Sequence, residues 1–195
     1  MFADTPLAAL LRPTSLDTFI GQEHLVGPNK PLRLMVEQNK VSSVIFWGPP
    51  GVGKTTLARL LAGADRRFFE LSAVSAGKAD IKAILADLTP LTTIKTPVLF
   101  LDEIHRFNKA QQDFLLPFIE SGKMLLIGAT TENPSFEVIP ALLSRTKVFT
   151  LRPLSLEELG EIADQAVVKM GQMHNKKIKM SAQAREWLLQ YSWGD

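Results

Sequence analysis

Short hydrophobic runs alternate, along the first 151 residues, with segments in which hydrophobic residues recur at every third or fourth position. The short runs are typical of buried β-strands, and the longer spacing is typical of helices that bury one face. The expected strands cover residues 43–47, 67–71, 98–101, 123–127 and 147–151. The expected helices cover residues 31–38, 81–88, 110–120 and 140–144, and one more begins near Lys54. This alternation predicts an α/β fold with a five-stranded parallel sheet covered on both faces.

The pattern changes after residue 151. Ser155 and Glu158 have the spacing of a capping box, in which the two side chains bond backbone N–H groups at the start of a helix. A helix is expected from there to about residue 170, and Ser181 begins another that runs to about residue 191. We therefore predict an α/β domain at residues 1–151 and the start of a helical domain at residues 152–195.

The composition is that of an ordinary globular protein, with 46% hydrophobic and 22% charged residues. No hydrophobic run approaches the roughly 18 residues of a membrane span, and residues 1–13 lack the basic start of a secretory signal. The sequence has no cysteine, which excludes disulfides and thiolate metal sites. We expect a cytoplasmic protein that makes no membrane contact. The formal net charge of +2 says little about nucleic acid, because many nucleic-acid-binding domains are far more basic.

The segment GPPGVGKTT matches G-x-x-x-x-G-K-[ST], the pattern of a phosphate-binding loop. Its residues are Gly48, Pro49, Pro50, Gly51, Val52, Gly53, Lys54, Thr55 and Thr56. Small residues let backbone N–H groups point at phosphate oxygens, Lys54 adds a positive charge, and the following helix directs its positive end at the same phosphates. The hydroxyl of Thr55 is placed to ligate Mg²⁺. A glycine-rich turn could match by chance, but the strand before it and the helix after it favour a nucleotide site.

Asp102 and Glu103 directly follow the predicted strand 98–101. Ligands of an open parallel sheet bind beyond the carboxyl ends of its strands, so this strand delivers two carboxylates to the crevice beside the phosphate loop. We expect Asp102 to hold Mg²⁺ or its water ligands, and Glu103 to orient or deprotonate the water that attacks the γ-phosphate. The alternative is a solvated acidic turn. His105 has no metal-ligand spacing with the other histidines, so we expect it to pack or hydrogen-bond locally.

The segment 128–134, GATTENP, follows the predicted fourth strand and places hydroxyl and amide groups at the same edge of the sheet. Thr130, Thr131 or Asn133 could contact the γ-phosphate or the attacking water. Asn and Pro are equally ordinary turn residues, and the spacing alone does not decide. Arg145 follows a predicted short helix. It is either a surface residue that pairs with a carboxylate or a planar cation that reaches the phosphates of a neighbouring subunit.

These motifs together resemble the AAA+ ATPases of the clamp-loader and RuvB branch. More narrowly, RPTSLDTFIGQEHLVG, HRFNKAQQD and IGATTENPSFEVIPALLSR are similar to the RarA (MgsA) family of replication-associated recombination proteins, whose eukaryotic counterpart is the Werner-helicase-interacting ATPase. The resemblance implies a P-loop NTPase domain of AAA+ type followed by an α-helical lid, with Ile20 and Gly21 near the adenine. It also implies that Thr131 or Asn133 is the sensor-1 residue and that Arg145 is the arginine finger.

The activity that the resemblance implies is that of a Mg²⁺-dependent ATPase, with ATP and Mg²⁺ as cofactors, acting at stalled replication forks and single-strand/duplex junctions. The implied partners are DNA, single-strand-binding protein and further copies in a homo-oligomer, in the cytoplasm and associated with the nucleoid. A RuvB-like branch-migration motor or a clamp-loader subunit is the alternative in the same class. A nucleotide-gated binding module with little hydrolysis is the alternative in another class. The intact Glu103 argues against it, because a pure switch does not need that carboxylate.

The family's second sensor is an Arg that follows a Gly-Asp pair in the lid, and here Gly194 and Asp195 are the last two residues. The resemblance therefore implies a fragment that lacks the rest of the lid and the oligomerisation region. Such a fragment should be mainly monomeric and should bind ADP or ATP weakly. It should hydrolyse ATP far more slowly than the intact protein, because two cationic groups that stabilise the transferred charge are missing.

Overall fold

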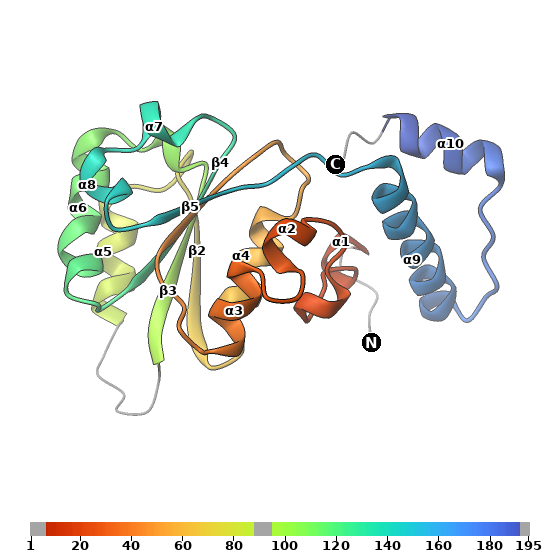
Figure 1. Ribbon diagram of the computed structural model, residues 1–195, viewed down its shortest axis with the longest axis horizontal. Helices are drawn as coiled ribbons and strands as arrows, with labels where there is room; N and C mark the ends of the chain where they lie inside the picture. The colour runs from red at the N-terminus through yellow and green to blue at the C-terminus, as the bar shows by residue number, and fades with distance from the viewer. Residues whose placement is uncertain (1–6, 88–94, 192–195) are drawn as a thin grey trace.

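The computed structural model describes residues 7–87 and 95–191. Its centre is a parallel β-sheet whose five described strands lie in the order β2-β3-β4-β1-β5 (Figure 1). The strands are β1 (Val44–Trp47), β2 (Arg66–Ser72), β3 (Lys95–Asp102), β4 (Leu125–Thr130) and β5 (Lys147–Thr150). All of these pairings are parallel, so the five-stranded parallel sheet predicted from the alternating pattern is confirmed.

Helices cover the sheet from both sides (Figure 1). Those on one side are α1 (Leu7–Leu10), η1 (Leu16–Thr18), α2 (Glu23–Val26), α3 (Pro31–Glu37) and α4 (Lys54–Ala62). Those on the other side are α5 (Lys78–Asp87), η2 (Ile104–Arg106), α6 (Lys109–Glu120), α7 (Pro134–Glu137) and α8 (Pro140–Leu143). The last two, α9 (Leu156–His174) and α10 (Ala182–Tyr191), lie beyond α1 and α2, away from the sheet.

The central strand β3 shows how the sequence produces two hydrophobic layers. Val98 and Phe100 face the cluster that contains α3 and α4, whereas Leu99 and Leu101 face the cluster that contains α5 and α6. All four side chains are fully buried, because successive residues of a strand point to opposite faces and both faces are covered. A continuous hydrophobic run is therefore the pattern that a central parallel strand requires.

The fourth strand begins and ends later than the sequence predicted. β4 runs to Thr130, so residues 128–130 belong to the strand, where the sequence placed them after its end. Small residues are needed here because η2 packs on this part of the strand: a Cβ at Gly128 would lie 3.1 Å from Ile104 Cδ1. Packing against η2 therefore explains why this part of the strand contains a small residue of the kind that is also common in turns.

Helix α7 occupies a segment for which a turn was one of two interpretations. Asn133 is its N-cap, and the side-chain oxygen accepts a hydrogen bond from the backbone N–H of Ser135 at 3.0 Å. Pro134 stands at the first helical position, where its missing N–H costs nothing. The Asn-Pro pair thus starts a short helix at the edge of the sheet.

The two helices predicted after residue 151 are present. α9 begins with the predicted capping box of Ser155 and Glu158, and it ends at His174, a turn later than expected. Asn175 closes it in a left-handed conformation, and the side chain of Ser181 accepts a hydrogen bond at the start of α10. Residues 89–90, where the sequence predicted the end of α5, and the last two residues lie outside the described ranges.

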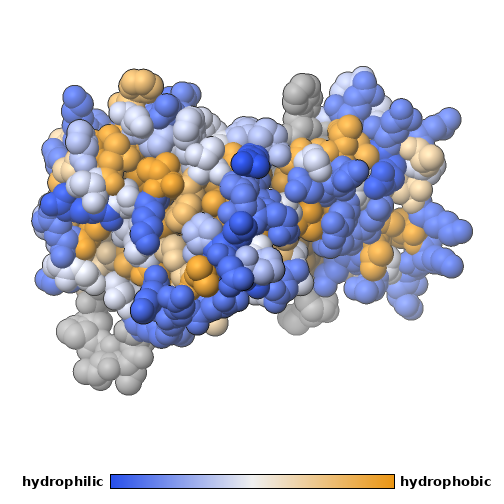
Figure 2. Space-filling view, in the orientation of Figure 1, coloured by the Kyte–Doolittle hydropathy of each residue, from blue (hydrophilic) through white to orange (hydrophobic). Residues whose placement is uncertain are grey.

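Hydrophobic and hydrophilic residues are interspersed on the face shown in Figure 2. The largest exposed hydrophobic side chain on the α5–α8 side is Phe136 of α7, which is 85% exposed. Within residues 7–87 and 95–191, no helix is both long enough and apolar enough to cross a membrane. The buried hydrophobic residues form the two clusters that flank the sheet.

Candidate active site

The phosphate loop joins β1 to α4, as its pattern predicted. Gly51 and Gly53 have φ angles of 72° and 94°, and Gly53 is the N-cap of α4. A Cβ at Gly53 would lie 2.6 Å from Phe19 Cζ, so both the backbone conformation and the neighbouring ring demand glycine. The loop can therefore turn tightly enough for its N–H groups and the start of α4 to surround an anion.

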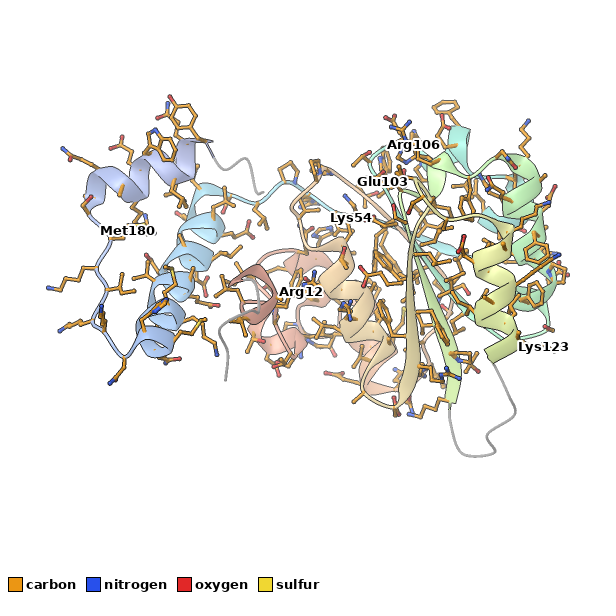
Figure 3. All side chains as sticks on the ribbon, turned by 180° about the vertical axis from the view of Figure 1, so that it is seen from behind. Arg12, Lys54, Glu103, Arg106, Lys123 and Met180 are labelled. Carbon is orange, nitrogen blue, oxygen red and sulfur yellow. The ribbon has the colours of Figure 1, made fainter. Side chains whose placement is uncertain are left out.

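Lys54 lies at the centre of this loop. Its ammonium group donates hydrogen bonds to the carbonyl oxygens of Gly48 and Pro49 at 2.8 and 2.7 Å, and the residue is only 8% exposed. Burial lowers the pKa of Lys54 below its usual value, whereas the charges of Glu103 and Asp102 oppose that shift. Only β4 lies between β1 and β3 in the described sheet, so the phosphate loop after β1 and the acidic pair at the end of β3 meet at one end of the sheet, where Figure 3 shows Lys54 and Glu103.

The acidic pair stands where β3 ends. Asp102 is the last residue of the strand, and its Oδ1 accepts a hydrogen bond from the backbone N–H of Glu103 at 3.1 Å. Glu103 has a left-handed backbone conformation with a φ of 54°, which is costly for a residue with a side chain. Its Oε2 is buried and accepts no hydrogen bond from the described residues. A buried carboxylate oxygen that has no hydrogen bond from the described residues, and lies 3.1 Å from His105 Nδ1, fits a role in binding a water molecule.

The donor set of Thr55 and Asp102 fits Mg²⁺ that is bound together with a nucleotide. Thr55 is the second residue of α4, and Asp102 ends β3. The part of the chain that the structure describes contains no group of three or more His, Cys, Asp or Glu side chains able to hold a metal by themselves. Mg²⁺ in nucleotide sites usually takes one or two protein ligands and completes its shell with phosphate oxygens and water. The two predicted ligands match that requirement.

The predicted sensor residues follow β4. Thr130 is fully buried, and its hydroxyl contacts the backbone of Glu132. Thr131 is partly exposed, and Asn133 uses its side-chain oxygen to cap α7. This leaves the amide group of Asn133 and the hydroxyl of Thr131 as the available donors at this edge. The choice between them stays a prediction.

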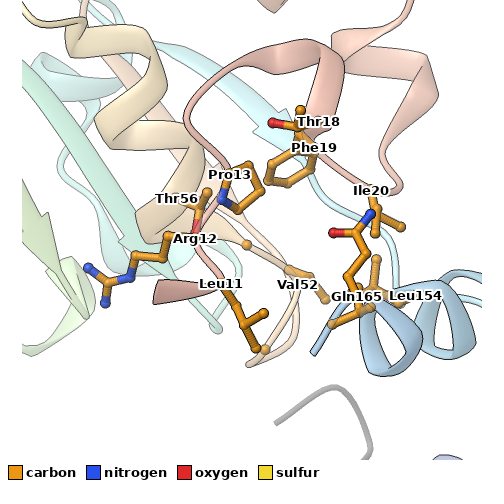
Figure 4. A pocket seen from close by; sticks show the side chains of 13 residues that line it. Leu11, Arg12, Pro13, Thr18, Phe19, Ile20, Val52, Thr56, Leu154 and Gln165 are labelled. Atoms are coloured by element: carbon orange, nitrogen blue, oxygen red, sulfur yellow. The ribbon is translucent and has the colours of Figure 1, made fainter. Parts of the chain in front are cut away.

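A cavity of about 370 Å³ opens beside the phosphate loop (Figure 4). Its walls come from three parts of the chain: the segment that contains Ile20, the loop residues 51–53, and α9, which contributes Ile162 and Gln165. Gly21 does not line the cavity but packs behind it, close to Leu154. An apolar cavity next to a phosphate site suits a nucleotide base. The family resemblance implied that Ile20 lies near the adenine, but the sequence gave no signal for the wall formed by α9.

Two side chains fix the segment around Ile20 to the end of β5 and to the linker between β5 and α9. Gln22 is 4% exposed, donates to the carbonyl oxygen of Arg152 at 2.7 Å and accepts from the N–H of Arg152 at 2.9 Å. His24 Nε2 lies 3.0 Å from the carbonyl oxygen of Thr150. The cavity walls contributed by the N-terminal segment and by the start of α9 are therefore held together.

Arg145 is not brought to the phosphate loop of its own chain by any described contact. It lies just after α8, where its guanidinium donates to the carbonyl oxygen of Ala141 at 2.8 Å and to Ser144 Oγ at 2.9 Å. Its Nη2 lies 2.5 Å from Glu120 Oε1 at the end of α6. Both expectations for Arg145 therefore stay open, because a surface ion pair and an exposed cation for a neighbouring subunit are both compatible with this position.

The sequence model of the "ATPase family associated with various cellular activities (AAA)" matches residues 44–154. The chain belongs to this AAA family. Among curated AAA relatives, it is 50% identical over 165 residues to the replication-associated recombination protein A of Haemophilus influenzae, covering 83% of this chain and 37% of that protein. It is 43% identical over 192 residues to the ATPase WRNIP1 of Dictyostelium discoideum, covering 97% of this chain and 22% of that protein.

A solved structure with the same fold is the RuvB Holliday junction branch migration motor of Thermotoga maritima. The TM-score is 0.73 at 34% sequence identity, and the alignment covers 94% of this chain and 61% of that one. The chain spans less than half the length of the curated relatives above. The resemblance to AAA+ proteins inferred from the motifs is thus confirmed at the level of family and fold.

Proposed function

We propose that this chain is the nucleotide-binding part of a Mg²⁺-dependent ATPase that works on DNA in replication-associated recombination. The observation that carries the proposal is that the ends of β1 and β3 bring Lys54 together with Asp102 and Glu103 at one end of the sheet. A phosphate cation, a metal ligand and a water-activating carboxylate are the groups that ATP hydrolysis needs from the protein. Residues 1–151 form the nucleotide-binding domain in this proposal, and residues 152–195 begin the lid.

Each group has a defined part in the reaction. Loop N–H groups and Lys54 bind the phosphates, and Thr55 and Asp102 would hold Mg²⁺, which neutralises charge on the phosphate oxygens. Glu103 accepts a proton from the attacking water as the water oxygen bonds to the γ-phosphorus and the bond to the β–γ bridging oxygen breaks. The amide of Asn133 or the hydroxyl of Thr131 orients that water or the γ-phosphate. These residues together would bind the phosphates, hold the metal, take up the proton and orient the attacking water.

The DNA and assembly parts of the proposal rest on the names of the relatives and on the motifs. We expect the full-length gene product to act at stalled forks and single-strand/duplex junctions, with single-strand-binding protein as a partner, in the cytoplasm with the nucleoid. We also expect a homo-oligomer, in which Arg145, exposed just after α8, would complete the site of a neighbouring subunit.

The test separates nucleotide binding from hydrolysis in the full-length gene product. Lys54→Ala should abolish ATP binding because the phosphate cation is lost, whereas Glu103→Gln should bind ATP and lose most hydrolysis because an amide cannot accept the proton. Lys123→Ala is the matched control, since Lys123 is exposed and lies at the opposite end of the sheet (Figure 3). Wild-type rates of hydrolysis in Glu103→Gln would contradict the proposal.

A RuvB-like branch-migration motor is the second candidate, because the RuvB structure shares this fold over 94% of the chain. The two candidates differ in the DNA that stimulates them. ATP hydrolysis by the full-length gene product should be measured with four-way junctions, forks and single-strand/duplex junctions of equal length. Stimulation by four-way junctions alone, together with junction migration, would favour the motor over the fork-associated ATPase.

A further inference from the structure

His105 lies between the two segments that form the hydrolytic part of the site. It belongs to η2, which follows the acidic pair, and its side chain is only 9% exposed. Its Nδ1 lies 3.0 Å from Thr130 Oγ1 at the end of β4 and 3.1 Å from Glu103 Oε2. One ring nitrogen thus contacts both the carboxylate proposed to activate water and the strand that leads to Thr131 and Asn133.

The hydrogen bonds of Thr130 favour a proton on the ring nitrogen that faces it. The Thr130 hydroxyl lies 3.2 Å from the carbonyl oxygen of Glu132, to which it can donate, and its oxygen accepts from the Glu132 N–H at 3.0 Å. When the hydroxyl donates to Glu132, its remaining acceptor position faces His105 Nδ1. We therefore assign the proton to Nδ1, which is also the nitrogen that faces Glu103.

The same Nδ1–H has a second acceptor within reach. Glu103 Oε2 is buried, has no hydrogen bond from the described residues, and lies at nearly the same distance from Nδ1 as the hydroxyl does. A small rotation of the ring or of the carboxylate exchanges one acceptor for the other.

We propose that His105 is a positioning residue that couples the carboxylate of Glu103 to the segment after β4. When this segment shifts, the Nδ1–H that is shared between Thr130 and Glu103 shifts with it, and the carboxylate is directed toward or away from the attacking water. The inference rests on the proposed function, since it assigns a partner to the group that activates water. His105 itself does not contact nucleotide or water in this role.

The experiment compares two replacements of His105 in the full-length gene product. The side-chain nitrogen of Asn can occupy the place of Nδ1, whereas the nitrogen of Gln reaches the place of Nε2 and leaves Thr130 and Glu103 without their shared donor. His105→Gln should lower the turnover number for ATP by about tenfold or more, with the dissociation constant for ATP changed by less than about twofold. His105→Asn should recover most of the turnover.

A substitution at Thr130 approaches the same link from the other strand. Thr130→Val removes the hydroxyl and Thr130→Ser keeps it, so only the first should lower turnover. The effects of Thr130→Val and His105→Gln should be clearly less than additive, because both break one contact. Thermal unfolding of each variant reports stability, and a purely structural role predicts losses of turnover that follow the loss of stability in all four variants.

The outcomes distinguish the two proposals. If the wild-type protein hydrolyses ATP and His105→Gln does so equally fast, the proposed role of His105 is wrong. The same holds if His105→Asn has no higher turnover than His105→Gln. In both cases the proposed ATPase function still stands. If the wild-type protein binds ATP without hydrolysing it, the proposed function fails and the role of His105 fails with it. Selective loss in His105→Gln and recovery in His105→Asn would support the coupling.

Discussion

Replacing Gln112 with methionine should destabilise the fold and disturb the segment that ends in Arg145. Gln112 belongs to α6 and is 1% exposed. Its amide nitrogen donates to the carbonyl oxygens of Phe107 and Glu137, both at 2.9 Å, and its Oε1 accepts from the N–H of Ile139 at 2.9 Å. The amide thus connects the start of α6 to the chain on either side of Val138, between α7 and α8.

The expected magnitude follows from these three hydrogen bonds. Methionine has a similar volume, so the loss of polar contacts dominates the change. Each bond contributes about 1 kcal/mol net, which gives about 3 kcal/mol for the set. The carbonyl of Glu137 belongs to an exposed residue and can regain water, whereas Phe107 is buried, so its carbonyl is left without a partner. The loss should therefore be spread unevenly over the three bonds, with Phe107 contributing most.

Urea unfolding followed by circular dichroism measures this change. Gln112→Met should lower the free energy of unfolding by about 3 kcal/mol, whereas the control Gln172→Met, on the exposed face of α9, should change it by less than about 0.5 kcal/mol. ATP affinity should change little, because the hydrogen bonds of Gln112 involve neither the phosphate loop nor α4. A loss below about 1 kcal/mol would refute the reasoning that these buried bonds hold α7 and α8 in place.

Other expectations can be checked separately. Mixing full-length Arg145→Ala with full-length Lys54→Ala should restore ATP hydrolysis if Arg145 acts on a neighbouring subunit's nucleotide, and no recovery would mean that it acts within its own subunit. Gly53→Ala should weaken ATP binding by about tenfold or more in calorimetry, because the φ of 94° and the ring of Phe19 exclude a Cβ, and wild-type affinity would contradict this. Burial lowers the pKa of Lys54 from its usual 10.5, so the unfolded chain retains this proton to higher pH than the folded chain. The free energy of unfolding of the wild type, relative to Lys54→Met, should therefore rise as the pH increases toward 10.5 in urea titrations, and a constant difference would contradict it.

The sequence predicted the elements of the fold better than their limits. Hydrophobic runs such as 98–101 are unambiguous, because a strand buried on both faces tolerates no polar residue. The end of β4 was missed because the packing of Ile104 requires a small residue at Gly128, and small residues are also what turns contain. Strand order could not be predicted either, since it depends on contacts between segments far apart in the chain.

The candidate site was predictable where one short segment contains all of its chemistry. The phosphate loop and the acidic pair are local motifs, and their meeting followed from the rule for parallel sheets. The base cavity was only partly predictable, since Gln165 reaches it from a helix more than a hundred residues after the phosphate loop. The local hydrogen bond expected for His105 is present, but its position between Thr130 and Glu103 depends on how β3 and β4 are aligned.

The strand order has a consequence for how the protein is made. β1 is synthesised first, yet it pairs with β4 and β5, which are synthesised last. Until residue 130 has been translated, the hydrophobic strand Val44–Trp47 has neither of its neighbours, and its second neighbour β5 is complete only at residue 150, while β2 and β3 already have each other. The nascent chain therefore carries an unpaired hydrophobic strand for much of its synthesis, and such segments are the ones that chaperones protect. Its phosphate loop gains a firm support only near the end of the domain, so nucleotide can assist the final closure of the sheet but not its beginning.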